Sequence, residues 1–205
     1  MSQALSARRC FRLGAVTALA LVVGYASPMP LPYFAPLFAW LLAATPAPPI
    51  GPRFLVGLVV VAVVGLSVGR LLAPMLMQFP VTAFLLAALG LYFSFYITLN
   101  LGKAVLGVFL TMGLMLISVT GILSLPLADA MIDSLAWGLV IAVLAQWLVY
   151  PWFPESDPFP PPVAPPGAAQ SNWVALRGTL ITLPVFWVAL AYPATYIPVM
   201  MKAVT

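Results

Sequence analysis

Carboxylates are scarce in this 205-residue chain, which has four Asp and Glu against eight Lys and Arg and contains no His. Two of them, Asp129 and Asp133, are four residues apart and would share one face of a helix. A buried carboxylate beside another carboxylate has a raised pKa and can exchange a proton near neutral pH. We therefore predict a proton pathway through this pair, with Asp133 as its main carrier. The alternative is that Asp129 caps a helix start and Asp133 lies among hydrated lipid headgroups.

Arg70 is the second charged candidate. It lies at the outer end of the apolar run 54–72, at a depth similar to that expected for Asp133. An ion pair between Arg70 and Asp133 would neutralise both charges and hold two helices together. An unpaired Arg70 could instead attract an anionic substrate, or its guanidinium could reach the phosphates of the lipid headgroups.

Aromatic residues gather toward the inner end of the apolar run 81–99. Tyr92 and Tyr96 share one predicted helix face, with Phe93 and Phe95 beside them in the sequence. Their rings could stack on an aromatic substrate that enters from the cytoplasm. An aromatic belt at the membrane interface has the same composition, so both interpretations stay open. Other polar side chains could line a pathway or merely bridge helices, namely Asn100, Thr111 and Gln146.

Composition excludes most catalytic and metal-binding arrangements. Without His there is no His-activated nucleophile, and Cys10 is the lone cysteine where a zinc site needs several ligands. Gly102-Lys103 is not a phosphate-binding loop, because Ala104 stands where that loop needs Ser or Thr. We therefore expect no catalytic residue, no bound metal and no cofactor, and hence no enzymatic activity. The basic residues are spread along apolar segments, so we expect no nucleic-acid partner either.

The elements that must position these side chains are membrane-spanning helices. The chain is 64% hydrophobic and 6% charged, with a mean hydropathy of +1.14, whereas soluble domains have about a quarter charged residues. A helical span needs about 20 mostly apolar residues. We predict an all-α, polytopic transmembrane helical bundle whose spans follow the apolar runs 11–26, 31–44, 54–72, 81–99, 104–123, 126–150 and 173–190.

Three regions follow from these runs and from the prolines. Residues 1–151 would form a six-span transmembrane unit, and residues 152–172 a Pro-rich cytoplasmic linker. Residues 173–205 would hold a seventh span and the start of an incomplete eighth. The spacing of Arg and Thr in Arg12–Thr17 recurs in Arg177–Thr182, which indicates the start of a second, parallel repeat.

The basic residues predict the orientation, since Lys and Arg near span ends stay on the cytoplasmic side. With a cytoplasmic amino terminus and every run crossing, Arg53, Lys103 and Arg177 all lie inside and Arg70 lies outside. A re-entrant hairpin over residues 31–44 would move the three inner residues outward, so we expect that run to cross.

Close contact between helices is predicted at one place. Residues Gly65 to Gly69 read Gly-Leu-Ser-Val-Gly, a small-xxx-small pattern that lets two helix backbones approach each other. This pattern indicates packing rather than chemistry.

Three segments resemble one known family. They are the Arg-Cys-Phe-Arg head at residues 9–12, the Leu-Pro-Tyr-Phe-Ala-Pro corner at residues 31–36, and the exit Trp-Leu-Val-Tyr-Pro-Trp-Phe-Pro at residues 147–154. With the closely spaced spans between them, they resemble the amino-terminal membrane half of the fusaric-acid-resistance-like, or aromatic acid exporter, family of bacterial inner-membrane proteins. The resemblance covers about residues 8 to 154.

The resemblance implies a function. Family members are secondary exporters of small weak acids, often aromatic, that use the proton gradient and frequently work beside a periplasmic membrane-fusion adaptor protein. They usually have two membrane halves, whereas the sequence given ends about one and a half spans into the second. We therefore expect either a fragment or a homo-oligomer in the lipid bilayer. The alternative function is a non-transporting scaffold or assembly subunit of an efflux complex, which the scarcity of charge in the spans favours.

Overall fold

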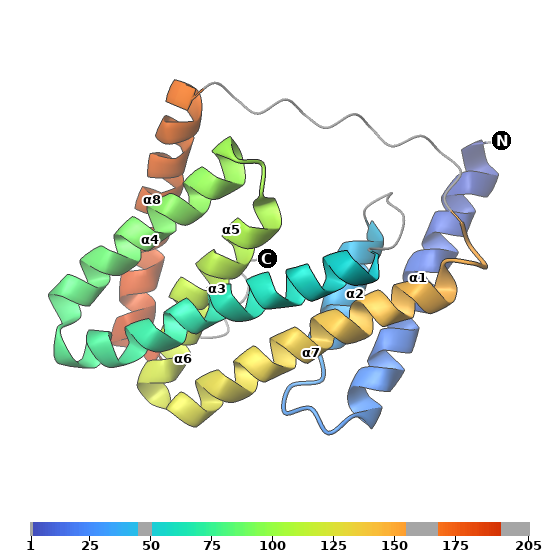
Figure 1. Ribbon diagram of the computed structural model, residues 1–205, viewed down its shortest axis with the longest axis horizontal. Helices are drawn as coiled ribbons and strands as arrows, with labels where there is room; N and C mark the ends of the chain where they lie inside the picture. Colours follow the sequence, from blue (N-terminus) through green and yellow to red (C-terminus); the bar gives the residue numbers. More distant parts are fainter. Residues whose placement is uncertain (1, 45–50, 155–167, 194–205) are drawn as a thin grey trace. The chain divides into compact units, whose positions relative to one another are not determined.

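The computed structural model describes residues 2–44, 51–154 and 168–193, and these ranges are helical apart from short connections. No strand occurs within them, so the all-α prediction is confirmed (Figure 1). The helices are α1 (Ser2–Ala26), α2 (Phe34–Ala44), α3 (Pro52–Gln78), α4 (Pro80–Asn100), α5 (Ala104–Met112), the π-helix η1 (Gly113–Ile117), α6 (Ser118–Leu123), α7 (Leu125–Val149) and α8 (Ala168–Ala191).

Six segments of the described chain are long and apolar enough to cross a membrane, as in a multi-pass membrane protein. They are Arg8–Ala26, Pro52–Gln78, Pro80–Asn100, Ala104–Leu123, Leu125–Val149 and Asn172–Ala191. Much of the linker predicted at 152–172, and the eighth span expected after residue 193, lie outside the described residues.

The span expected over residues 31–44 is shorter than predicted. Helix α2 begins only at Phe34, because Pro30 and Pro32 hold the preceding residues in turns. Its 11 residues make a helix of about 16 Å, whereas the hydrocarbon core of a bilayer is about 30 Å thick. A full-length spanning helix over these residues is therefore not present.

Helices α1 and α2 nevertheless form a complete antiparallel hairpin. At the connecting end, a Cβ on Gly24 would lie 3.0 Å from the Cβ of Ala35. At the other end, the Arg12 guanidinium donates a hydrogen bond to the carbonyl oxygen of Ala43, at 3.5 Å. The short helix therefore ends at the level of Arg12.

The chain divides into two compact units, each described by itself. The first comprises residues 1–59 and 133–162, and contains α1, α2, the start of α3 and most of α7. In this unit Gly138 of α7 lies against the start of α2, where an added Cβ would be 3.1 Å from the Cβ of Phe34. Helices α2 and α7 can approach each other closely here because Gly138 has no side chain.

The second unit comprises residues 60–132 and 163–205, and its centre is the crossing of α3 and η1. A Cβ on Gly69 would overlap the carbonyl oxygen of Gly113, and a Cβ on Gly113 would overlap that of Gly65. The close approach predicted from the small-xxx-small pattern is thus confirmed. All five residues of η1 are buried, so the wider π turn lies at the most crowded point of this span.

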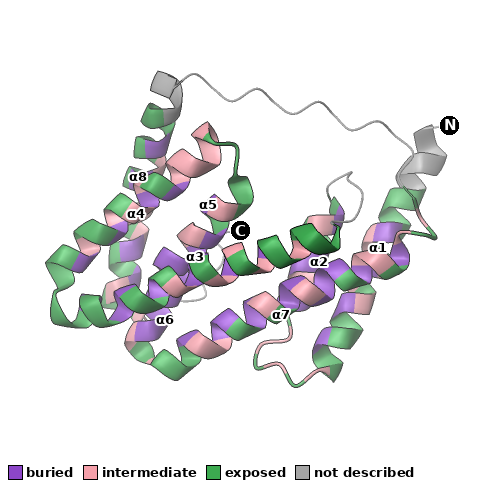
Figure 2. Ribbon diagram, viewed as in Figure 1, coloured by how far each residue is buried: buried purple, intermediate pink, exposed green. Residues whose placement is uncertain are grey.

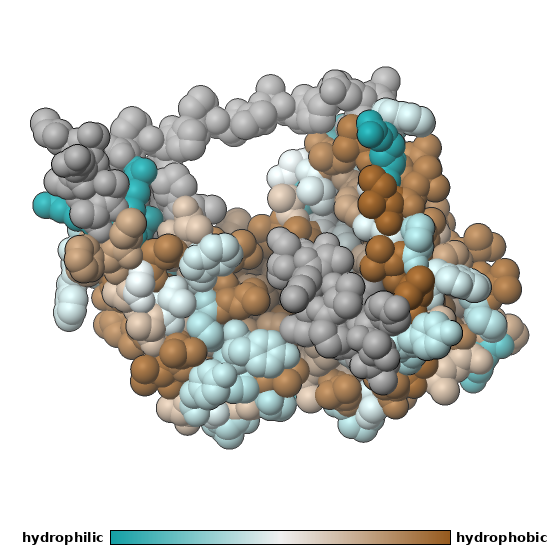
Figure 3. Space-filling model, turned by 180° about the vertical axis from the view of Figure 1, so that it is seen from behind, coloured by the Kyte–Doolittle hydropathy of each residue, from teal (hydrophilic) through white to brown (hydrophobic). Residues whose placement is uncertain are grey.

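Helix α8 packs antiparallel along α4 within the second unit (Figure 1). The ring of Phe84 lies 6.0 Å from that of Phe186, and at the other end a Cβ added to Gly178 would lie 3.4 Å from the ring of Phe95. Most residues of α8 are otherwise exposed or intermediate (Figure 2). Figure 3 shows apolar side chains, in brown, over much of the visible surface, as expected for helices surrounded by lipid.

Candidate functional site

An ion pair joins two of the predicted site residues. Arg70 of α3 donates from Nε to Oδ1 of Asp129 and from Nη2 to Oδ2, the second bond at 3.1 Å. This bidentate arrangement matches the planar fork of the guanidinium to both carboxylate oxygens. The side chains are about half exposed, at 46% and 44%. The pair therefore connects α3 to the start of α7 in the second unit.

The prediction that Arg70 pairs with Asp133 was wrong by one helical turn, because the partner of Arg70 is Asp129. Depth counted from the span ends does not fix which residues of two helices face each other, because that depends on how the helices are packed. The alternative that Asp129 caps a helix is also wrong, since it is the fifth residue of a helix that begins at Leu125. Its carboxylate is used in the ion pair instead.

Asp133, unlike Asp129, is not part of the ion pair. It lies eight residues after Leu125, about 12 Å along α7, and it is exposed. Its side chain has no hydrogen bond or ion pair within the described part of the chain.

Tyr92 and Tyr96 share a helix face, as predicted. Their ring centroids are 6.4 Å apart with an angle of 28° between the planes, and both are half-buried. Phe93 meets Tyr92 edge to face at 5.9 Å. The three rings form a small aromatic surface on the second half of α4.

A cluster of hydroxyls lies between α4 and α5. The Ser94 hydroxyl donates to the carbonyl oxygen of Gly107 and lies 2.6 Å from the Thr111 hydroxyl, and Ser94 is fully buried. Thr111 therefore bridges helices, which was one of its two predicted roles. Ser94 was not predicted from the sequence, although it lies three and seven residues after the buried residues Leu91 and Ala87, a spacing that places all three on one helix face.

Arg12 is a buried cation that the sequence analysis treated only as an orientation signal. Its side chain is among the buried residues, at 6% exposure, and it reaches the last turn of α2 through Ala43. The negative end of a helix dipole favours a cation there.

In the corner before α2, burial raises the pKa of the Tyr33 hydroxyl above its ordinary value, so this hydroxyl stays neutral at physiological pH.

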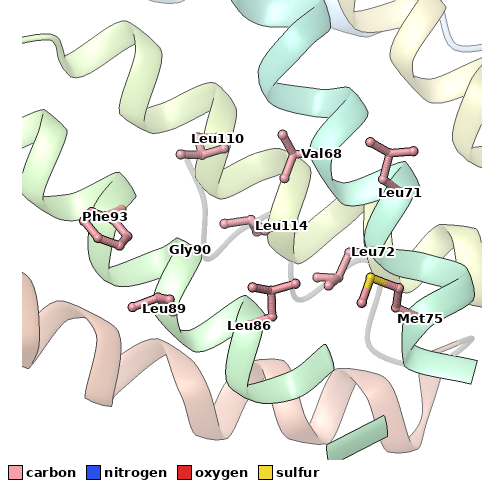
Figure 4. A pocket seen from close by; sticks show the side chains of 10 residues that line it. All are labelled: Val68, Leu71, Leu72, Met75, Leu86, Leu89, Gly90, Phe93, Leu110 and Leu114. Atoms are coloured by element: carbon pink, nitrogen blue, oxygen red, sulfur yellow. The ribbon is translucent and has the colours of Figure 1, made fainter. Parts of the chain in front are cut away.

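The second unit also contains a cavity of about 300 Å³ between α3, α4 and the α5–η1 segment (Figure 4). Apart from Gly90, every residue around it has an apolar side chain. The lining residues are Val68, Leu71, Leu72, Met75, Leu86, Leu89, Gly90, Phe93, Leu110 and Leu114. Neither Tyr92 nor Tyr96 is among them. A carboxylate in this cavity would therefore find no side-chain hydrogen-bond donor.

Comparison with known families decides where the chain belongs. Residues 9–149 match the family model described as protein of unknown function, DUF2955. The chain is a member of the DUF2955 family. No curated protein and no solved structure matches it.

The DUF2955 segment contains all the predicted site residues and ends with α7, before α8. Among the described residues of this DUF2955 protein, no group of three His, Cys, Asp or Glu side chains could hold a metal ion. The described residues of this segment thus include the Arg70–Asp129 ion pair, the separate carboxylate of Asp133, an aromatic surface, a hydroxyl cluster and an apolar cavity.

Proposed function

We propose that this DUF2955 protein is a proton-coupled exporter of small weak acids, aromatic ones among them, in the bacterial inner membrane. The observation that carries the proposal is Asp133, a carboxylate without a partner in the described chain, on a helix long enough to cross the membrane. An Asp at the centre of a span costs about 2.5–3.5 kcal/mol on insertion scales. Such a residue usually serves a proton or substrate pathway.

The ion pair supports this assignment by elimination. Arg70 and Asp129 neutralise each other and hold α3 to α7. Arg70 is then occupied, so the anion-attracting role considered for it is disfavoured. Among the acids of the described spans, Asp133 is left as the candidate proton carrier.

The proposed orientation places the amino terminus in the cytoplasm. In the second unit, Lys103 follows the end of α4 and Arg177 lies at the same end, because Gly178 contacts Phe95. Two basic residues at one end of a helical unit favour the cytoplasmic side. Tyr92 and Tyr96 then lie in the inner half of α4, where their rings could meet an aromatic acid entering from the cytoplasm. A periplasmic adaptor and homo-oligomerisation remain expectations from the family resemblance.

The test is growth of a bacterial host in the presence of benzoic acid, with the chain expressed as wild type, Asp133→Asn or Asp133→Glu. We expect the wild type to raise the tolerated concentration, Asp133→Asn to abolish that gain, and Asp133→Glu to keep part of it because the proton-binding group remains. Immunoblots of isolated membranes confirm equal insertion. Full resistance from an inserted Asp133→Asn variant would contradict the proposal.

A non-transporting scaffold is the second candidate, and two observations favour it. The cavity offers no polar side chain to a carboxylate, and several hydroxyls in the spans, such as Ser94 and Thr111, are used between helices. If the protein is a scaffold, expression of the wild-type chain gives no resistance by itself. If it is an exporter, expression gives resistance that depends on Asp133.

A further inference from the structure

The apolar cavity is a groove along the helix axes. Its lining runs from Val68 to Met75 on α3 and from Leu86 to Phe93 on α4, a length of about 10 Å on each helix. Leu72 and Leu114 are buried at its base, whereas Leu71, Leu89 and Phe93 are half or more exposed at its rim. Gly90 widens the groove, because an added Cβ there would lie 2.8 Å from Leu114 Cδ1.

The groove opens where hydrocarbon surrounds the protein. The helices α3 and α4, and the segment formed by α5, η1 and α6, are long and apolar enough to cross the membrane. The residues Leu86–Phe93 are at the centre of α4, which runs from Pro80 to Asn100. Water does not fill a space without polar partners, and an empty space forfeits dispersion contacts. A hydrocarbon group from the surrounding bilayer would restore those contacts.

The size of the groove distinguishes a lipid chain from a protein helix. A volume of about 300 Å³ over a length of about 10 Å gives a cross-section of about 30 Å². A helix with its side chains, about 10 Å across, has a cross-section of about 80 Å². The groove is too narrow to enclose a whole helix, but it accepts a single extended hydrocarbon chain parallel to α3 and α4.

We propose that this groove binds one acyl chain of a membrane lipid, held by dispersion contacts along α3, α4 and η1. The site depends only on the membrane location of these helices and not on the exporter function. The lipid's headgroup plays no part in the binding, because the groove has no charged or hydrogen-bonding side chain. Selectivity is then for a hydrocarbon chain and not for a headgroup.

The test uses the full chain in vesicles of phosphatidylethanolamine and phosphatidylglycerol, with a tracer phosphatidylcholine that carries a diazirine in the middle of one acyl chain. After illumination, mass spectrometry compares the number of adducts per residue over residues 86–93 with the number at Leu180, an exposed residue of α8 outside the groove. We expect labelling of residues 86–93 to exceed that of Leu180 several-fold in the wild type. Equal labelling at the two places would overturn the proposal without any variant.

A matched pair of variants locates the site. Val68→Trp fills the groove from its rim, whereas Val64→Trp places the same side chain one turn earlier on α3, at an exposed residue outside the groove. We expect Val68→Trp to lower labelling of residues 86–93 to the Leu180 level and Val64→Trp to leave it unchanged. Leu86→Trp replaces Val68→Trp if gel filtration shows that the latter is aggregated. Undiminished labelling in a folded groove-filling variant would contradict the site.

A second copy on this surface would give a different result. Labelling of residues 86–93 would then fall below that of Leu180, and a Leu89→Cys variant in a Cys10→Ser background would form disulfide-linked dimers. Both outcomes would overturn the lipid assignment.

Discussion

At the scale of single residues, the bidentate ion pair between Arg70 and Asp129 joins two charged groups of the described spans. Each partner makes the other tolerable in a membrane, since the bidentate pair is neutral as a whole. Removal of one partner leaves an uncompensated charge, whereas removal of both leaves none. The pair therefore acts as a unit.

This predicts non-additive effects of substitution. Arg70→Ala and Asp129→Ala should each lower the amount of inserted protein and its melting temperature in detergent. The double variant should be more stable than either single variant, because no charge is left unpaired. Immunoblots of membranes and thermal melting measure this. Effects that simply add would show that the two side chains do not interact.

Ser94 offers a second test at this scale. Its hydroxyl joins α4 to the carbonyl oxygen of Gly107, whereas the Ser67 hydroxyl bonds only within α3, to the carbonyl oxygen of Val63. We expect Ser94→Ala to cost about 1 kcal/mol of stability and Ser67→Ala to cost less. Melting temperatures of the two variants give the comparison, and equal losses would argue against a bridging role for Ser94.

Sequence reasoning reached the residue types of the site but not their partners. Scarcity of charge in an apolar chain is enough to single out Arg70, Asp129 and Asp133. The choice of Asp129 over Asp133 as the partner of Arg70 depends on the packing of α3 against α7, which no local pattern encodes. The side-by-side rings of Tyr92 and Tyr96 follow from helix geometry alone and were predicted correctly.

At the scale of elements, glycines determine how closely the helices of the second unit approach. Gly69 touches the backbone of Gly113 at the crossing of α3 and η1, and no side chain fits between them. Gly57 is on the same helix with open space around it. The two glycines therefore separate the effect of packing from the effect of helix propensity.

We expect Gly69→Ala to destabilise the protein by about 1–3 kcal/mol or more, since the new methyl group would force the helices apart. Gly57→Ala should be neutral or stabilising by up to about 1 kcal/mol, because Ala favours helix over Gly. Thermal unfolding in detergent measures both. Similar melting temperatures for the two variants would contradict the close crossing.

The extent of a helix could be predicted from the sequence where it depends only on hydropathy and on nearby prolines. The six apolar runs other than 31–44 became long helical segments. The run 31–44 did not, because Pro30 and Pro32 delay the helix start until Phe34. The π turn at η1 and the packing of α8 on α4 depend on contacts between distant segments, so the sequence patterns did not reveal them.

At the scale of the whole molecule, the account depends on helices that cross the bilayer in alternating directions. Six described helices are suited to crossing, and the α1–α2 hairpin returns the chain to the level of Arg12. Composition alone predicted this class of protein. The proposed proton carrier, the cytoplasmic entry for an acid and the lipid-facing groove all presuppose this arrangement.

The most direct test is cysteine accessibility in intact cells and inverted vesicles. In a Cys10→Ser background, single variants Lys103→Cys, Arg177→Cys and Phe79→Cys are exposed to a membrane-impermeant maleimide. The account predicts that Lys103→Cys and Arg177→Cys react only in inverted vesicles, from the cytoplasmic side. It predicts that Phe79→Cys, in the connection between α3 and α4, reacts only in intact cells. Reaction of Phe79→Cys from the same side as Lys103→Cys would contradict it.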